Sequence, residues 1–123
     1  MNSYIIVTNN PLVIEHYRDS QIIIEQTYLS VLEKVRDYIH LGHKLLTHPL
    51  AGSVKPNQNP FRTVLISRSS TSLDFNSLSL IENAIEVANK MISEHQTPSW
   101  GEEVRKDFQF VDKSHIDSAM RNI

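Results

Sequence analysis

The sequence predicts a single α/β domain in which helices cover both faces of a small sheet. Two short apolar runs, residues 4–8 and 21–25, are rich in β-branched residues and lack polar alternation, which is typical of strands buried on both faces. The segments that follow them carry apolar residues at three- and four-residue steps, as amphipathic helices do. This alternation favours a compact three-layer, mostly parallel, Rossmann-like sheet of about four strands, followed by a C-terminal helical tail.

Capping residues indicate where the helices begin. Pro11 opens a short helix, because a proline at the first helical position has no N–H group to leave unsatisfied. Thr27 and Asp74 are suitable N-caps for two longer helices, which are expected to reach about His40 and His95. Each long helix has one apolar stripe, so each is expected to pack against the sheet.

Two further strands and a long connection complete the predicted sheet. Residues 44–47 are expected to form a short third strand, and residues 61–67 (FRTVLIS) a fourth. The connection between them contains three of the five prolines. Loops of this length in a small domain are usually functional or disordered. We expect this loop to fold over the same edge of the sheet at which Asn9 and Asn10 emerge.

The end of the chain differs in composition from the rest. Residues 1–96 are expected to form the α/β domain, and residues 97–123 a tail that docks on it or binds a partner. Ser114 and Asp117 resemble a capping box that would start a terminal helix. Docking on its own domain is the favoured alternative, and a homodimer formed through the tail is the other.

Composition excludes several classes of function. The chain has no cysteine, so disulfides, thiolate metal ligands and thiol catalysis are excluded. The net charge is −2 with acids and bases mixed, so no nucleic-acid partner is expected. Neither a secretory signal nor a run of membrane-spanning length occurs, so we expect a cytoplasmic protein without membrane contact. His40, His43 and His48 lack a fixed carboxylate partner, and no metal or other cofactor is expected.

Polar residues follow every predicted strand. The carboxyl ends of parallel strands meet at one edge of a sheet, where ligands commonly bind. Amide, hydroxyl, imidazole and cationic groups would gather there and form a pocket for a small anionic or zwitterionic molecule. The predicted ligand-binding residues are Asn9, Asn10, Glu25, Thr47, His48, Ser53, Lys55 and Arg62.

Several of these residues have structural alternatives. His48 is the candidate acid or base of an enzyme, with Glu25 orienting it, or it hydrogen-bonds the backbone of a tight turn. Ser53 and Lys55 resemble part of a phosphate cradle, although the motif GxxxxGK[ST] does not occur. Arg62 either clamps an anion from outside the pocket or caps the sheet edge.

Three segments resemble one family. They are IVTNNPLV (residues 6–13), GHKLLTHPLAGSVKPNQNPF (residues 42–61) and LDF (residues 73–75). Together with neighbouring residues, over about residues 4–91, they resemble the GrdX-like family of small accessory proteins encoded beside glycine, betaine or sarcosine reductase components. The resemblance implies an accessory role in amino-acid fermentation and transfers no catalytic residue. Since the chain has no cysteine, it is not itself a thiol redox carrier.

The favoured function is therefore a cytosolic, non-catalytic, ligand-binding accessory protein of the glycine reductase system. One alternative is a small enzyme that uses His48 as acid or base. The other is an assembly protein whose tail binds a second copy or a glycine reductase-pathway protein.

Overall fold

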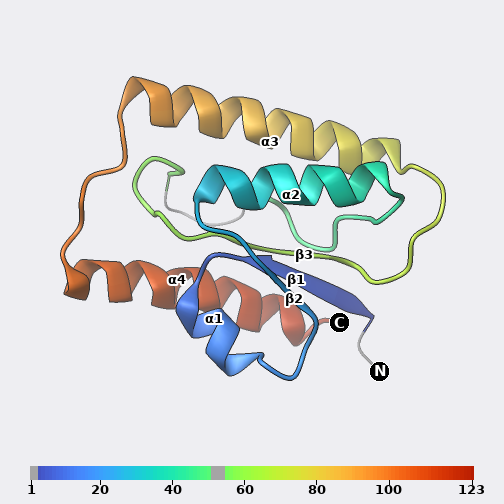
Figure 1. The fold of residues 1–123 in the computed structure, drawn as a ribbon, viewed down its shortest axis with the longest axis horizontal. Coiled ribbons are helices and arrows are strands. Elements are labelled where there is room, and N and C mark those ends of the chain that lie inside the picture. The colour runs from blue at the N-terminus through green and yellow to red at the C-terminus, as the bar shows by residue number, and fades with distance from the viewer. Residues whose placement is uncertain (1–2, 51–54) are drawn as a thin grey trace.

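The computed structural model, which describes residues 3–50 and 55–123, has a three-stranded mixed sheet with helices on both faces (Figure 1). The strands are β1 (Tyr4–Thr8), β2 (Ile22–Ile24) and β3 (Thr63–Ser67), in the order β2-β1-β3. β2 is parallel to β1, whereas β3 is antiparallel to it. The start of β3 therefore lies beside the carboxyl end of β1.

The prediction of about four, mostly parallel strands in a Rossmann-like sheet is wrong. Residues 44–47 form no strand, and Leu45 makes only an isolated bridge to Ile66. The connection that follows runs to the carboxyl end of β1 before β3 begins, so β3 must return in the opposite direction. A buried apolar run has the same pattern in either direction, so periodicity could not distinguish the two arrangements.

The first two helices begin at their expected caps. Helix α1 (Pro11–His16) has Pro11 at its first position, and the Asn10 side chain accepts a hydrogen bond from the Leu12 amide at 3.0 Å. Helix α2 (Tyr28–His40) has a capping box in which Thr27 and Ser30 satisfy each other's backbone amides. Pro11 and Thr27 were sufficient to predict where these two helices begin, because helix capping depends only on neighbouring residues.

Helix α3 begins at the cap predicted from the sequence, whereas helix α4 does not. Helix α3 (Phe75–Glu94) is capped by Asp74, and hydrogen bonds from the Ser77 hydroxyl and amide lower the pKa of that carboxyl. Helix α4 (Glu102–Met120) begins well before the predicted capping box. Ser114 lies inside α4, and its hydroxyl donates to the Val111 carbonyl at 2.7 Å. Acidic residues in the first turn marked the true start, since they favour a helix N-terminus.

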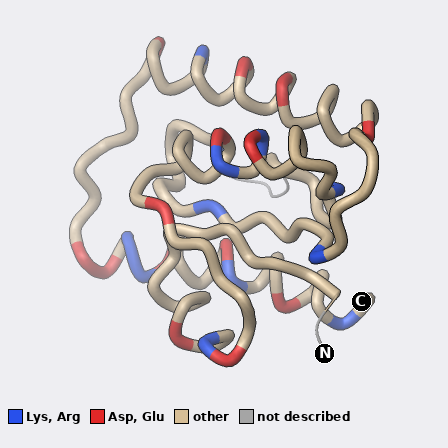
Figure 2. Tube along the Cα trace, turned by 45° about the vertical axis from the view of Figure 1, so that its right-hand side comes forward, with Lys and Arg blue, Asp and Glu red and all other residues tan. Residues whose placement is uncertain are grey.

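Strands β1 and β3 are buried on both faces of the sheet, whereas β2 at the edge is only partly buried. Ile5, Val7 and Val64 pack in a core with α2 and α3, whereas Ile6 and Leu65 pack with Val13 of α1 and Ile116 of α4. Alternate residues of each strand thus face opposite layers, which explains the continuous apolar runs. Acidic and basic residues are distributed over all layers (Figure 2). Within the described chain, no helix has the length and apolar character needed to cross a membrane.

Candidate functional site

The carboxyl end of β1 joins the long loop through Asn9. The side-chain oxygen of Asn9 accepts a hydrogen bond from the backbone amide of Arg62 at 2.8 Å, and the Asn9 side-chain amide donates to the Pro60 carbonyl at 2.8 Å. The loop and the Asn pair therefore meet at the same edge of the sheet, as expected from the sequence. They meet because β3 is antiparallel and begins at this edge.

A buried carboxylate from α4 is bonded to Asn10 and to the start of β3. Asp112 is 1% exposed and forms an ion pair of 2.9 Å with the Arg62 guanidinium, whose side chain is 7% exposed. It also accepts hydrogen bonds from the Thr63 amide at 3.0 Å, the Thr63 hydroxyl at 2.6 Å and the Asn10 side-chain amide at 3.0 Å. Charge-assisted bonds of this kind anchor α4 to the start of β3.

This cluster extends across the strand ends. The Thr8 and Thr63 hydroxyls are 2.6 Å apart, and the Asn10 amide donates to the Thr8 hydroxyl at 3.0 Å. The Asn10 side chain also donates to the Gln109 carbonyl at 2.8 Å. Asn10 and Arg62 are thus buried, and the Arg62 guanidinium is held by Asp112.

Further contacts fix the start of α4 over the loop. The Trp100 indole donates to the Gln58 carbonyl at 2.7 Å, and the Asn59 side chain donates to the Phe108 carbonyl at 3.3 Å. The Arg105 guanidinium lies 5.0 Å from the centre of the Phe61 ring, within the range of a cation–π contact. These contacts hold Arg105 at the edge of the sheet.

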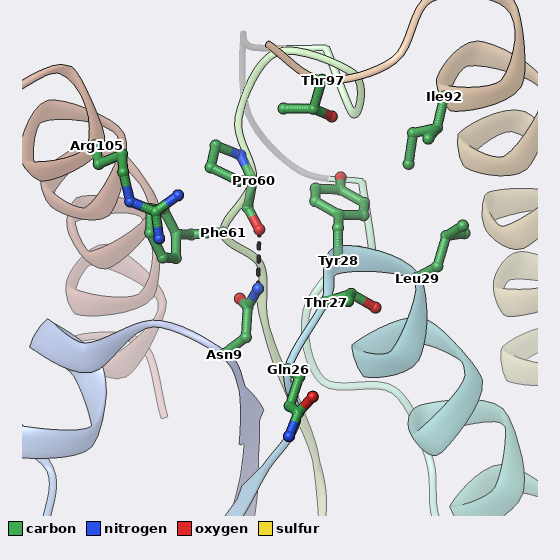
Figure 3. A pocket seen from close by; sticks show the side chains of 10 residues that line it. All are labelled: Asn9, Gln26, Thr27, Tyr28, Leu29, Pro60, Phe61, Ile92, Thr97 and Arg105. Carbon is green, nitrogen blue, oxygen red and sulfur yellow. Dashed lines mark hydrogen bonds between the residues drawn. The ribbon is translucent and has the colours of Figure 1, made fainter. Parts of the chain in front are cut away.

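A cavity of about 380 Å³ lies between this edge, the start of α2, the end of α3 and the start of α4. Its size is in the range of small-molecule sites. Figure 3 shows Arg105 beside Phe61 on one side and Thr27, Tyr28 and Leu29 on the other. The described residues that line it are Asn9, Gln26, Thr27, Tyr28, Leu29, Pro60, Phe61, Ile92, Thr97 and Arg105.

The cavity favours negative charge. Among its described lining residues, Arg105 alone carries a charge. Helix α2 also begins here, so its first amide groups have no acceptor within the helix and its positive dipole end is at the cavity. Burial raises the pKa of Tyr28 although the Arg62 guanidinium opposes this effect, so the phenol is neutral at physiological pH.

Family membership follows from the sequence as a whole. The model of the family described as GrdX-like protein matches residues 5–121 of the 123-residue chain. This chain belongs to the GrdX-like family. No curated protein and no solved structure matches it. The family match extends through α4, beyond residues 4–91, to which the resemblance seen in the sequence was limited.

A second cleft, of about 250 Å³, lies in this GrdX-like protein between Thr47, His48 and the last turns of α4. The Thr47 hydroxyl accepts a hydrogen bond from the Leu65 amide at 3.0 Å. The His48 Nδ1 atom accepts one from the Leu50 amide at 3.0 Å, which is the backbone-bonded alternative considered for this residue. Arg62 and Thr63 also line this second cleft.

The predicted site residues therefore do not line one common pocket. Asn9 lines the first cavity, whereas Thr47, His48 and Arg62 line the second cleft. Glu25 is half-buried beside the end of β1, where its amide donates to the Thr8 carbonyl at 2.9 Å, and it lines neither. Lys55 is exposed, and Ser53 lies outside the described residues.

Sequence reasoning missed Asp112, Arg105, Tyr28 and Phe61. A signal for Asp112 was present, because it lies four residues before the buried Ile116 and so falls on the apolar face of α4. A carboxylate on such a face needs a buried partner. No comparable signal marked Tyr28 or Phe61, which look like ordinary core residues.

Two of the histidines considered for metal binding, His43 and His48, have a ring nitrogen at hydrogen-bond distance from a backbone group. His43 Nδ1 is 2.7 Å from the Ser67 carbonyl, and its ring packs edge-on against Tyr38. Within residues 3–50 and 55–123, no group of three or more His, Cys, Asp or Glu side chains is arranged to hold a metal ion.

Proposed function

We propose that this GrdX-like protein is a cytoplasmic, non-catalytic accessory protein that binds a small anionic or zwitterionic molecule in the cavity beside Arg105. Membership in the GrdX-like family suggests an association with the glycine reductase system. The observation that carries the ligand proposal is a cavity of about 380 Å³ whose described wall holds one cation, Arg105, and no acid.

The absence of catalysis is proposed because the groups suited to proton transfer serve the fold. Asp112 accepts its hydrogen bonds from Arg62, Thr63 and Asn10. Burial raises the pKa of Tyr28, which makes its phenol a poor base at neutral pH. The sequence also has no cysteine that could serve as a nucleophile.

The enzyme alternative receives less support. It needs His48 to face a carboxylate such as Glu25. Among the described residues, the hydrogen bond of His48 goes to the Leu50 amide, and no described bond joins it to an acid. The assembly alternative keeps one favourable observation, because Phe110 on α4 is 67% exposed.

A thermal-shift screen of small anions and amino acids tests the proposal. A ligand at one hundred times its dissociation constant adds about 2.7 kcal/mol to the free energy of unfolding, which is easily measured as a rise in Tm. The variant Arg105→Gln should reduce the shift to about half or less, whereas the control Arg121→Gln, at the exposed far end of α4, should keep it. A shift that is equal in Arg105→Gln, or no shift with any compound, would contradict the proposal.

A further inference from the structure

The polar side chains in the wall of the cavity are partly committed to the fold. Both polar groups of Asn9 are used, one by the Arg62 amide and one by the Pro60 carbonyl. The Thr27 hydroxyl accepts a hydrogen bond from the Ser30 amide at 3.0 Å in the capping box. The group best placed to select a charged ligand is therefore the Arg105 guanidinium.

Arg105 suits one planar, singly charged group. Its guanidinium carbon lies over the Phe61 ring, 5.0 Å from the ring centre, and its side-chain N–H groups have no hydrogen-bond partner among the described residues. A carboxylate matches that edge with two parallel hydrogen bonds. A phosphate monoester carries a charge of about −1.5 to −2 at neutral pH, which a single arginine does not balance.

The same wall offers no counter-charge for an ammonium group. None of its described lining residues is an aspartate or a glutamate. The α-ammonium of an amino acid would lie one carbon from the carboxylate and so close to the Arg105 guanidinium, and like charges at short distance repel each other. An acid without an amino group avoids that penalty.

The remainder of the wall is apolar and gives room for more than a carboxylate. Leu29 of α2, Ile92 of α3 and the side chains of Tyr28, Pro60 and Phe61 line the cavity (Figure 3). Each methylene group that a ligand buries against such a wall raises its affinity about fourfold. A bare anion such as acetate would leave this surface unused.

We infer that the ligand is a monocarboxylic acid with an apolar body, and that it is neither an amino acid nor a phosphorylated compound. Its carboxylate binds the Arg105 guanidinium, and its body packs on Phe61, Leu29 and Ile92. This inference rests on the proposed function and narrows its ligand from any small anion or zwitterion to one chemical class.

Isothermal titration of the full chain with matched compounds tests the class. 4-Methylpentanoate and leucine differ only in the α-ammonium, as do 3-phenylpropanoate and phenylalanine. In each pair the acid should bind at least about tenfold more tightly than the amino acid. The alcohols of the same skeletons, which lack the charge, should bind about tenfold to a hundredfold more weakly than the acids. Acetate and inorganic phosphate should bind at least about tenfold more weakly.

Two variants test which residue binds the carboxylate of the ligand and which contacts its apolar body. Arg105→Gln should weaken the better acid about tenfold to a hundredfold, and Arg121→Gln should not change it. Ile92→Ala should weaken that acid several-fold while leaving acetate unchanged, since only the apolar body reaches this residue. Equal or tighter binding of the amino acid in either pair, or equal binding of acetate or phosphate, would overturn the inference and leave the proposed function standing. No binding by any of these compounds would also overturn the inference, and the thermal-shift screen would then decide whether the proposed function stands.

Discussion

Replacing Asp112 with alanine is expected to lower the free energy of unfolding by about 3–5 kcal/mol, the cost of breaking a buried ion pair. The carboxylate is 1% exposed and accepts hydrogen bonds from Arg62, Thr63 and Asn10. Its removal takes the counter-charge from a guanidinium that is itself 7% exposed. It also removes the acceptor of a strand amide at the start of β3.

Urea unfolding measures this loss, with two probes. Trp100 is the only tryptophan, and it lies just before α4 with its indole bonded to the Gln58 carbonyl, so its fluorescence reports on the docked tail. Circular dichroism reports on all helices, and the two transitions should coincide if α4 unfolds with the rest. Asp107→Ala is the matched control, since it removes an exposed acid of the same helix and should change stability by at most about 0.5 kcal/mol.

The double variant Arg62→Met with Asp112→Ala separates the ion pair from simple loss of packing. The double variant should lose about 1–3 kcal/mol less free energy of unfolding than the sum of the two single variants, because no buried charge is then left without its counter-charge. Strict additivity would refute the reasoning. So would a loss below about 1 kcal/mol for Asp112→Ala alone, which is the value of an exposed ion pair.

Three further predictions concern other parts of the fold. Gly42→Ala should destabilise the protein by about 1–3 kcal/mol or more, measured by urea unfolding, because its φ is +103° and an added Cβ would lie 2.0 Å from a backbone carbonyl oxygen. Thr27→Ala should remove the capping box of α2 and lower the unfolding free energy by about 0.5–2 kcal/mol in the same assay. Burial acts to raise the pKa of Asp117, but hydrogen bonds from Lys113 and Tyr17 outweigh it and lower this pKa below its ordinary value of 3.8. The ionised Asp117 carboxylate therefore stabilises the fold fully above pH 3.8, and this stabilisation is lost as the pH falls through the lowered pKa. In thermal unfolding at different pH values, Lys113→Gln should reduce the part of the acid-induced fall in Tm that Asp117 causes.

Local chemistry made most helices predictable. Pro11, Thr27 and Asp74 mark helix starts that the structure reproduces, and these positions depend on residues within one turn. The Ser114 prediction failed for a related reason, since a hydroxyl inside a helix bonds the preceding turn and mimics a cap in the sequence. Deciding between the two requires knowledge of the whole helix.

Strand direction and the buried cluster depended on contacts between distant residues. β3 pairs with β1 across more than fifty residues, and its apolar pattern is the same in either direction. Arg62 and Asp112 are 50 residues apart, so the sequence showed a loop cation without showing its partner. The sequence therefore gave no indication that the Arg62 guanidinium is buried and paired with Asp112.

Helix α4 explains why the edge of the sheet has both a rigid cluster and an open cavity. Arg105 and Asp112 are seven residues apart, close to two helical turns, so they lie on the same face about 10 Å from each other along the axis. Asp112 fixes this face to β3, and the rigid helix then holds Arg105 over Phe61 at the cavity. A cation on a rigid element loses little freedom when it binds an anion. The buried ion pair is therefore what gives the exposed arginine a defined place, and the tail is a wall of the proposed site as well as a part of the core.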